Sequence, residues 1–263
     1  MDWLDNIITT FFDFEAMLQV LPQLLAIGLV NTLVISIWAT VIGIVLGMLI
    51  AIMGISPSRW LRVPARIYTD IFRGLPAILT ILLIGQGFAR FSQQVFGPSP
   101  YPLGILALSL IASAYMGEIF RAGIQSVDRG QLEACRALGM SYGKAMRLVV
   151  VPQGVRRVLP ALVNQFIAIV KDSSLVYFLG LLVSERELFR VGQDAAVLTG
   201  NLSPLVAAGL FYLAITVPLT HLVNYFDNRF RTGRRKATPP KSGLDEVEEQ
   251  RSTPVALTYG ENS

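Results

Sequence analysis

Long apolar stretches dominate the pattern of hydrophobic and polar positions along the chain. A helix needs roughly 20 mainly apolar residues to cross the hydrocarbon core of a bilayer. The stretches that reach this length are 24–53, 67–88, 103–124, 158–183 and 205–226. Asp70, Arg73 and Pro76 interrupt the start of the second stretch, which leaves a full span or a shorter, re-entrant segment open there. The pattern predicts an all-α membrane protein with about five transmembrane helices.

A different periodicity precedes the first apolar stretch. Within residues 1–22 the large apolar side chains recur every three or four positions, at Trp3, Ile7, Phe11, Phe14, Leu18 and Leu21. This spacing places them on one face of a helix. We expect an amphipathic helix that lies in the outer membrane interface, with packing against the helix bundle as an equal alternative.

Lysine and arginine are distributed unevenly among the segments that connect the apolar stretches. Segments 54–66, 125–157 and 227–241 hold fifteen of them, whereas segments 1–21, 89–102 and 183–204 hold three. Cytoplasmic loops carry the excess of positive charge. We therefore predict an outside N-terminus and a cytoplasmic C-terminus, which an odd number of spans also requires.

Composition agrees with a membrane protein and bounds its domains. Charged residues make up 15% of the chain and hydrophobic residues 53%, whereas a soluble domain carries about 25% charged residues. The first residues lack the basic region of a cleavable signal peptide. We expect one transmembrane domain at 23–228 and a cytoplasmic tail at 229–263, which is polar, contains proline and should be largely disordered.

The chemistry of an enzyme is missing from the sequence. The chain has one cysteine, Cys135, and one histidine, His221, so we expect no disulfide framework, metal site or Ser-His-Asp arrangement. The string "GMSYGKA" has three residues between its glycines where a phosphate-binding loop has four, and Ala145 follows its lysine. The sequence therefore does not predict an enzyme active site, and any ATP that the protein uses must be handled by another chain.

One segment between the third and fourth stretches is charged and amphipathic. Residues 131–138 contain good helix formers, and Gly139 can adopt the left-handed conformation that ends a helix. Ser141 can cap a second helix at 142–151, and we expect Pro152 to end it. The segment, about 126–157, is therefore predicted to be a bent helical hairpin on the cytoplasmic side, with a plain amphipathic loop as the alternative.

Four blocks of the sequence, in order, resemble the polar amino acid permease family of bacterial importers. They are "NTLVISIWATVIGIVLG", "FRGLPAILTILLIG", "AYMGEIFRAGIQSVDRGQLEA" and "LPALVNQFIAIVKDSSLVYFLG". The hairpin sequence "GQLEACRALGMSYGKAMRLVVVPQ" resembles the EAA loop of ABC transporter permease subunits, in which Glu-Ala precedes a glycine. The resemblance runs from about residue 31 to residue 226 and departs mildly at Cys135, where small residues are usual.

This resemblance implies a type I ABC importer permease fold and a set of partners. The hairpin would be a coupling helix, seated in a groove of an ATPase subunit. The residues implied in this contact are Glu133, Ala134, Arg136, Leu138 and Gly139. The implied complex contains a second permease, identical or paralogous, two ATPase subunits that bind ATP and Mg²⁺, and an extracellular substrate-binding protein. It lies in a bacterial cell membrane, surrounded by lipid, and does not involve nucleic acid.

Ionisable and polar side chains inside the predicted spans are candidates for the transport pathway. They are Glu118, Lys171, Asp172, Asn31 and Arg73. An amino acid carries both charges, so acceptors for its ammonium group and donors for its carboxylate are both needed. A network that only holds spans together is the alternative, and Arg121, one turn after Glu118, is placed to neutralise it.

The expected function is the permease of an ATP-driven importer of polar amino acids, with glutamate or glutamine as the expected substrate. The alternative is a proton-coupled secondary amino acid transporter that uses Glu118 and Asp172 as a proton relay. Many such carriers contain inverted repeats, and an odd number of spans without an obvious repeat disfavours that architecture. A scaffold that only anchors an ATPase is a third possibility.

Overall fold

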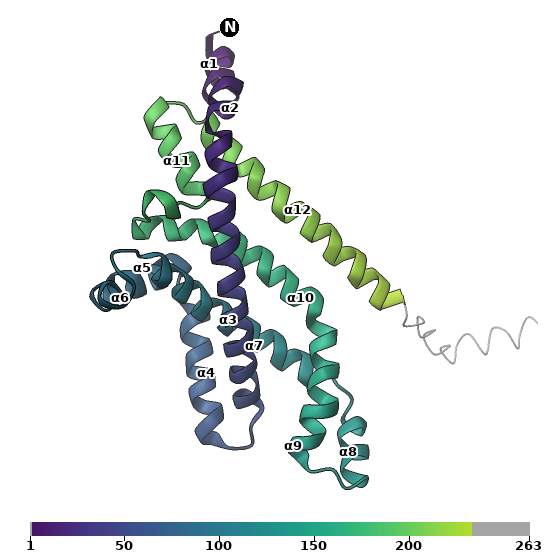
Figure 1. Ribbon diagram of the computed structural model, residues 1–263. Coiled ribbons are helices and arrows are strands. Elements are labelled where there is room, and N and C mark those ends of the chain that lie inside the picture. Colours follow the sequence, from purple (N-terminus) through teal and green to yellow (C-terminus); the bar gives the residue numbers. More distant parts are fainter. Residues whose placement is uncertain (1, 233–263) are drawn as a thin grey trace, which may run out of the picture. The chain divides into compact units, whose positions relative to one another are not determined.

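The computed structural model describes residues 2–232, and these residues form helices joined by short turns and loops (Figure 1). The described residues divide into two units, one that ends at Asn224 and one that begins at Tyr225. The predicted disordered tail at 229–263 lies almost wholly outside the described residues.

The N-terminal part of the chain is helical almost without a break as far as Ile55. Its elements are α1 (Asp2–Phe11), α2 (Phe14–Gln23), the π-helical turn η1 (Leu24–Gly28) and α3 (Leu29–Ile55). The Asp13 carboxylate caps α2 by accepting hydrogen bonds from the backbone N–H groups of Glu15 and Ala16. Pro22 lies inside α2, and the wider π turn follows it because proline cannot donate a helical hydrogen bond.

The second predicted span is broken. It consists of α4 (Arg59–Gly74) and α5 (Ala77–Gly87), which meet at an angle of 106°. Leu75 and Pro76 have extended ψ angles of 143° and 134°. Pro76 disfavours the helical conformation in Leu75, the residue before it. The pair has the form of a broken span or a re-entrant loop, so the structure keeps both sequence interpretations open. Helix α6 (Ala89–Phe96) follows.

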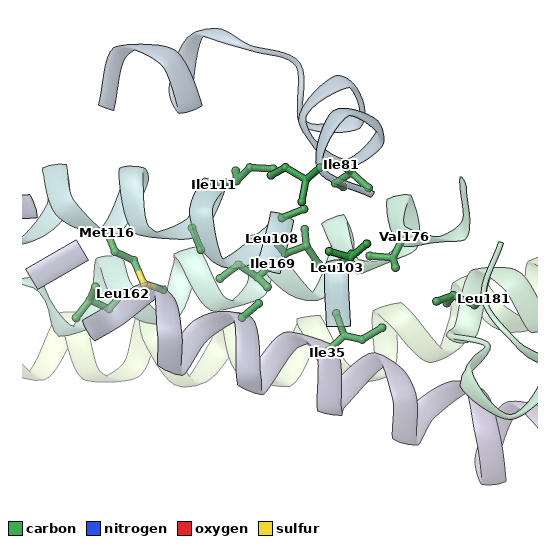
Figure 2. Packing of buried hydrophobic residues seen from close by; sticks show 14 of the residues in the cluster. Ile35, Ile81, Leu103, Leu108, Ile111, Met116, Leu162, Ile169, Val176 and Leu181 are labelled. Carbon is green, nitrogen blue, oxygen red and sulfur yellow. The ribbon is translucent and has the colours of Figure 1, made fainter. Parts of the chain in front are cut away.

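Helix α7 (Tyr101–Gln125) forms the centre of the main core and packs along α3 (Figures 1 and 2). Its buried face is rich in small residues, and α3 brings Gly43 and Gly47 against it. A Cβ atom built on Gly47 would lie 3.0 Å from both the Ser113 carbonyl oxygen and the Gly117 nitrogen. The two helices therefore approach to backbone contact, as small residues with three residues between them allow.

The hairpin consists of two helical arms, and its second arm forms one long helical run with the fourth span, Tyr142–Leu179. The elements are α8 (Arg129–Ala137), α9 (Tyr142–Ala145), the π-helical turn η2 (Met146–Val150), α10 (Val151–Asp172) and the 3₁₀ segment η3 (Ser173–Leu179). The prediction that Pro152 ends the second arm is wrong, because Pro152 lies in the first turn of α10, where its missing N–H is tolerated. The Val151 N–H bonds to the Met146 carbonyl instead, so the helix passes through a π turn.

The remaining elements are η4 (Val183–Glu185), α11 (Leu188–Thr199) and α12 (Ser203–Thr232). Four helical runs among the described residues are long and apolar enough to cross a membrane, and the bent α4–α5 pair makes a fifth if it counts as one span. This confirms the predicted all-α membrane fold. We call the end at which α3 meets α4 and α7 meets α8 the basic end, and the end with α11 the opposite end.

Candidate functional site

Local backbone chemistry fixes the bend of the hairpin. The Asp128 carboxylate caps the start of α8 through the Gly130 N–H. At its end, Gly139 has a φ of +80°, and its N–H bonds to the Arg136 carbonyl while the Met140 N–H bonds to the Cys135 carbonyl. These two bonds form the Schellman arrangement, which needs a left-handed residue. The Ser141 side chain then caps α9 through the Lys144 N–H.

The base of the hairpin packs tightly against the spans. Ile124, Val127 and Val150 form a small core there. Gly154 of α10 lies so close to α7 that an added Cβ would be 2.8 Å from the Ile124 backbone. The Arg157 guanidinium also donates to the Ser126 carbonyl oxygen at the end of α7. The two arms are therefore held firmly to the ends of α7 and α10.

The residues that the family resemblance implies in an ATPase contact lie together on the outside of this hairpin. Each of Glu133, Ala134, Arg136, Leu138 and Gly139 is exposed. The Leu138 side chain is 84% exposed, whereas Cys135 is buried. The residues implied in the contact thus lie on an accessible surface, although a single exposed apolar side chain such as Leu138 is common on protein surfaces.

A second cluster joins α4 and α7. Glu118 accepts a hydrogen bond of 2.7 Å from Arg121 and lies 3.7 Å from the guanidinium of Arg73. The Arg73 guanidinium also lies over the Tyr115 ring, 5.4 Å from its centroid. The three charged side chains are between 31% and 44% exposed. The structure thus brings Glu118 and Arg73 together, in a cluster that carries two positive charges and one negative charge.

Asn31 lies elsewhere, at the opposite end. Its side-chain amide donates to the backbone carbonyls of Ser184 and Arg186, and the Tyr101 hydroxyl donates to its side-chain oxygen over 3.2 Å. Tyr101 begins α7, seventeen residues before Glu118, which is about 25 Å along a helix. Asn31 and Glu118 therefore do not share one cluster.

Lys171 and Asp172 occupy the last turn of α10 and not its middle. Val158 packs against Gly123, and Val176 packs against Gly104, so α10 runs antiparallel to α7. This register places Lys171 and Asp172 nearer than Glu118 to the opposite end. Lys171 is exposed and Asp172 is partly exposed.

Glu187 is a buried carboxylate that the sequence interpretation did not single out. It is fully buried and accepts hydrogen bonds from the backbone N–H groups of Phe189 and Arg190 and from the Tyr212 hydroxyl. Burial raises the pKa of the Glu187 carboxyl to about 7, although these hydrogen bonds act to lower it. Glutamate is not among the usual N-cap residues, so the sequence gives little signal of its role.

No group of three histidine, cysteine, aspartate or glutamate residues with the geometry of a metal site occurs among residues 2–232. The clusters described above are made of ion pairs, caps and backbone hydrogen bonds. Their arrangement provides a rigid hairpin at one end and charged side chains along the helices.

Comparison with known proteins identifies the family. The sequence matches the binding-protein-dependent transport system inner membrane component over residues 43–232. It is 34% identical to the arginine transport system permease protein ArtQ of Bacillus subtilis, over 84% of this chain and 98% of that protein. It is 36% identical to the glutamate/aspartate import permease protein GltK of Escherichia coli, over 83% and 98%.

Solved structures of ABC transporters support the same assignment. A crystal structure of an amino acid ABC transporter with histidines superposes with a TM-score of 0.71 at 34% identity and covers 82% of this chain and 98% of that one. The inward-facing MetNI methionine ABC transporter gives a TM-score of 0.64 at 19% identity, over 83% and 98%, and shares the fold. These relatives are transport components of the inner membrane, which confirms the predicted bacterial membrane location and a transport subunit that is not itself an enzyme. The chain belongs to the family of binding-protein-dependent transport system inner membrane components, as the permease subunit of an ABC importer.

Proposed function

We propose that this chain lines the translocation pathway of an ATP-driven importer of polar amino acids. The relatives named above are permeases for arginine and for glutamate or aspartate, and another, from Rickettsia felis, is a putative glutamine permease, 34% identical over 82% of this chain and 98% of that protein. Family membership does not favour the proton-coupled alternative, because systems of this family depend on a binding protein.

The complete importer contains further chains. We expect a second permease, identical or paralogous, two ATPase subunits that bind ATP and Mg²⁺, and an extracellular substrate-binding protein. In one permease chain the side chains of Arg73, Glu118 and Arg121 stay partly exposed. This exposure is consistent with a pathway whose remaining wall is formed by a second permease.

The Arg73–Glu118–Arg121 cluster supports a carboxylate-bearing substrate. Glu118 neutralises one of the two guanidinium groups, so one positive charge is left for a ligand, and a guanidinium binds a carboxylate in a two-pronged geometry. Every amino acid offers a carboxylate, but the remaining positive charge would repel a cationic side chain such as that of arginine. We therefore infer that glutamate or glutamine is carried, with Lys171 and Asp172 further along the same pathway and Asn31 at its outer end. The test measures how strongly unlabelled glutamate, glutamine and arginine each inhibit the uptake of a labelled amino acid. If arginine inhibits most strongly, this inference is contradicted.

The hairpin is proposed to be the cytoplasmic coupling element. The single observation that supports this role best is its construction, in which the bend at Gly139 is fixed, the base is packed against α7 and α10, and the tip residue Leu138 is exposed. A rigid and exposed element can transmit a displacement from an ATPase to the spans, whereas a flexible loop would absorb it. Glu133 would pair there with a basic group of the ATPase.

Glu133→Ala tests this assignment in proteoliposomes that contain the assembled importer. Losing one partner of a desolvated charge pair costs roughly 2–5 kcal/mol, so we expect substrate-stimulated ATP hydrolysis and uptake to fall at least tenfold. Glu15→Ala, which removes an exposed glutamate of α2, should leave both rates unchanged. Normal uptake by a correctly assembled Glu133→Ala complex would contradict the coupling role.

The same vesicles separate the two transport classes. Uptake by the unaltered complex should stop when ATP is depleted and should not respond to a proton uncoupler. Uptake that continues without ATP but collapses with the uncoupler would instead establish the proton-coupled carrier.

A further inference from the structure

A large cavity at the basic end is not explained by coupling or by transport. Its volume is about 610 Å³, and it lies between the end of α3, the start of α4, the end of α7 and the hairpin. Its walls combine residues of the membrane-spanning body, such as Ile55, with residues of the hairpin, such as Leu132 and Met146. A ligand in this cavity would contact both parts at once.

Four arginines line the cavity, and they outnumber the acidic groups there. They are Arg62, Arg66, Arg121 and Arg129, and the one carboxylate in the lining is Asp128. Arg121 is bound to Glu118, and Asp128 already accepts a hydrogen bond from the Gly130 N–H. The structure gives no hydrogen bond or ion pair for the guanidinium groups of Arg62, Arg66 or Arg129 within residues 2–232.

An anion bound in the cavity would relieve the repulsion among these arginines. Arg62 and Arg66 are one turn apart on the same helix, where like charges repel, and a concave surface of one sign concentrates the field of its charges. Guanidinium groups fit phosphate oxygens with two parallel hydrogen bonds. A phosphate group is therefore the ligand chemistry that the cavity matches.

The surroundings indicate where the phosphate comes from. On α4, beside the two arginines in sequence, Trp60 is 90% exposed and Ile67 is 54% exposed. Tryptophan together with arginine at the end of a span is typical of the headgroup level of a bilayer, and basic pockets between spans on the cytoplasmic side bind anionic headgroups. The apolar wall residues Ile55, Leu132 and Val150 provide contacts for the glycerol and acyl part of a lipid.

We propose that this cavity binds the phosphate headgroup of an anionic phospholipid, held by Arg62, Arg66 and Arg129 at the base of the hairpin. The bound lipid links α4 to α8. This site goes beyond the proposed import function, and its lipid occupancy is measured without any transport, so either proposal can fail while the other stands.

The test uses the assembled importer in nanodiscs of phosphatidylcholine with a minor fraction of phosphatidylglycerol. Native mass spectrometry after a detergent wash counts the phosphatidylglycerol molecules that remain bound. Arg62→Gln/Arg66→Gln should weaken this retention roughly thirtyfold, since each arginine near an anionic headgroup contributes about a fivefold factor in affinity. Arg59→Gln/Arg156→Gln is the matched control, because it removes the same charge from exposed positions outside the cavity.

Three results would overturn the proposal. The first is equal retention by both double variants, which would place the lipid elsewhere. The second is displacement of the lipid by inorganic phosphate at matched concentration, which would make a soluble phosphate the ligand. The third is loss of ATPase binding in Arg62→Gln/Arg66→Gln with unchanged lipid retention, which would show that the arginines face an ATPase carboxylate. Equal melting temperatures of the variants in phosphatidylcholine alone exclude misfolding as the cause of lost binding.

Discussion

Gly139 is the residue on which the shape of the hairpin depends most. Its φ of +80° lies in the left-handed region, and an added Cβ would meet no atom within 4 Å. The cost of another residue there comes from the backbone alone, about 1–2 kcal/mol. Gly143, four residues on, also has open space but an ordinary helical backbone. A side chain would be crowded at neither glycine, so a comparison of the two positions measures the effect of the backbone conformation alone.

Gly139→Ala should loosen the end of α8, whereas Gly143→Ala should not. The strained turn opens more often, so we expect the amide hydrogens of α8 to exchange roughly tenfold faster in Gly139→Ala. Exchange in Gly143→Ala should stay the same or slow slightly, because alanine is the better helix former. Equal exchange rates in the two variants would mean that the turn does not need its left-handed residue.

The Glu187 carboxyl predicts a dependence of stability on pH. Its ordinary pKa of 4.5 is raised to about 7 in the folded protein, so the folded protein binds a proton that the unfolded chain releases between these values. The stabilisation is complete below pH 4.5 and is lost as the pH rises through 7. Glu187→Gln is neutral at every pH and does not show this loss.

We therefore expect Glu187→Gln to gain stability over the unaltered protein between pH 5 and pH 8, by roughly 3 kcal/mol at most. The melting temperatures of both proteins, measured in detergent at pH 5 and pH 8, test this expectation. Groups other than Glu187 contribute equally to both proteins, so their contribution cancels when one melting temperature is subtracted from the other. A gap that does not change with pH would show that the buried carboxyl keeps its ordinary pKa.

At the scale of elements, the contact between α3 and α7 holds the bundle together. Gly47 leaves no room for a side chain against α7, whereas Gly209 on α12 faces open space. Gly47→Leu should lower the melting temperature strongly or prevent assembly, because overpacking costs about 1–3 kcal/mol or more. Gly209→Leu should leave the melting temperature nearly unchanged, and an equal effect of both changes would contradict this view of the core.

Elements whose conformation depends on residues close by in the sequence could be predicted. The apolar stretches, the break before Pro76 and the bend at Gly139 all follow from local composition and backbone chemistry. The continuation of the helix past Pro152 could not be predicted in this way. A π turn at 146–150 changes the hydrogen-bond pattern before Pro152, so the helix continues although proline has no N–H to donate.

Contacts between distant residues could not be predicted from the pattern either. Asn31 bonds to the Ser184 carbonyl 153 positions away, and Glu187 is buried against Tyr212 of another helix. Both sets of partners exist only once the chain has folded. For the same reason Glu118 and Arg73 were each singled out as ionisable groups, but their closeness emerged only from the packing of α4 against α7.

At the scale of the whole molecule, one helical run links the hairpin to the opposite end of the membrane domain. Tyr142–Leu179 form a run of 38 residues, which is held to the end of α7 through Gly154 and Arg157. Under the proposed coupling role, a displacement of the hairpin would be transmitted along α10 toward the opposite end. This continuity is the physical basis of the proposed coupling.

The most direct test of this account measures access to the pathway while the hairpin is either intact or made flexible. The reporter is Tyr115→Cys, beside Arg73, in a Cys135→Ser background, labelled with a membrane-impermeant maleimide from either side of the assembled importer. With the intact hairpin, a non-hydrolysable ATP analogue should reduce labelling from the cytoplasmic side and increase it from outside. Two glycines inserted between Ala145 and Met146 should abolish this switch while the ATPase still binds, whereas an undiminished switch in that variant would contradict the account.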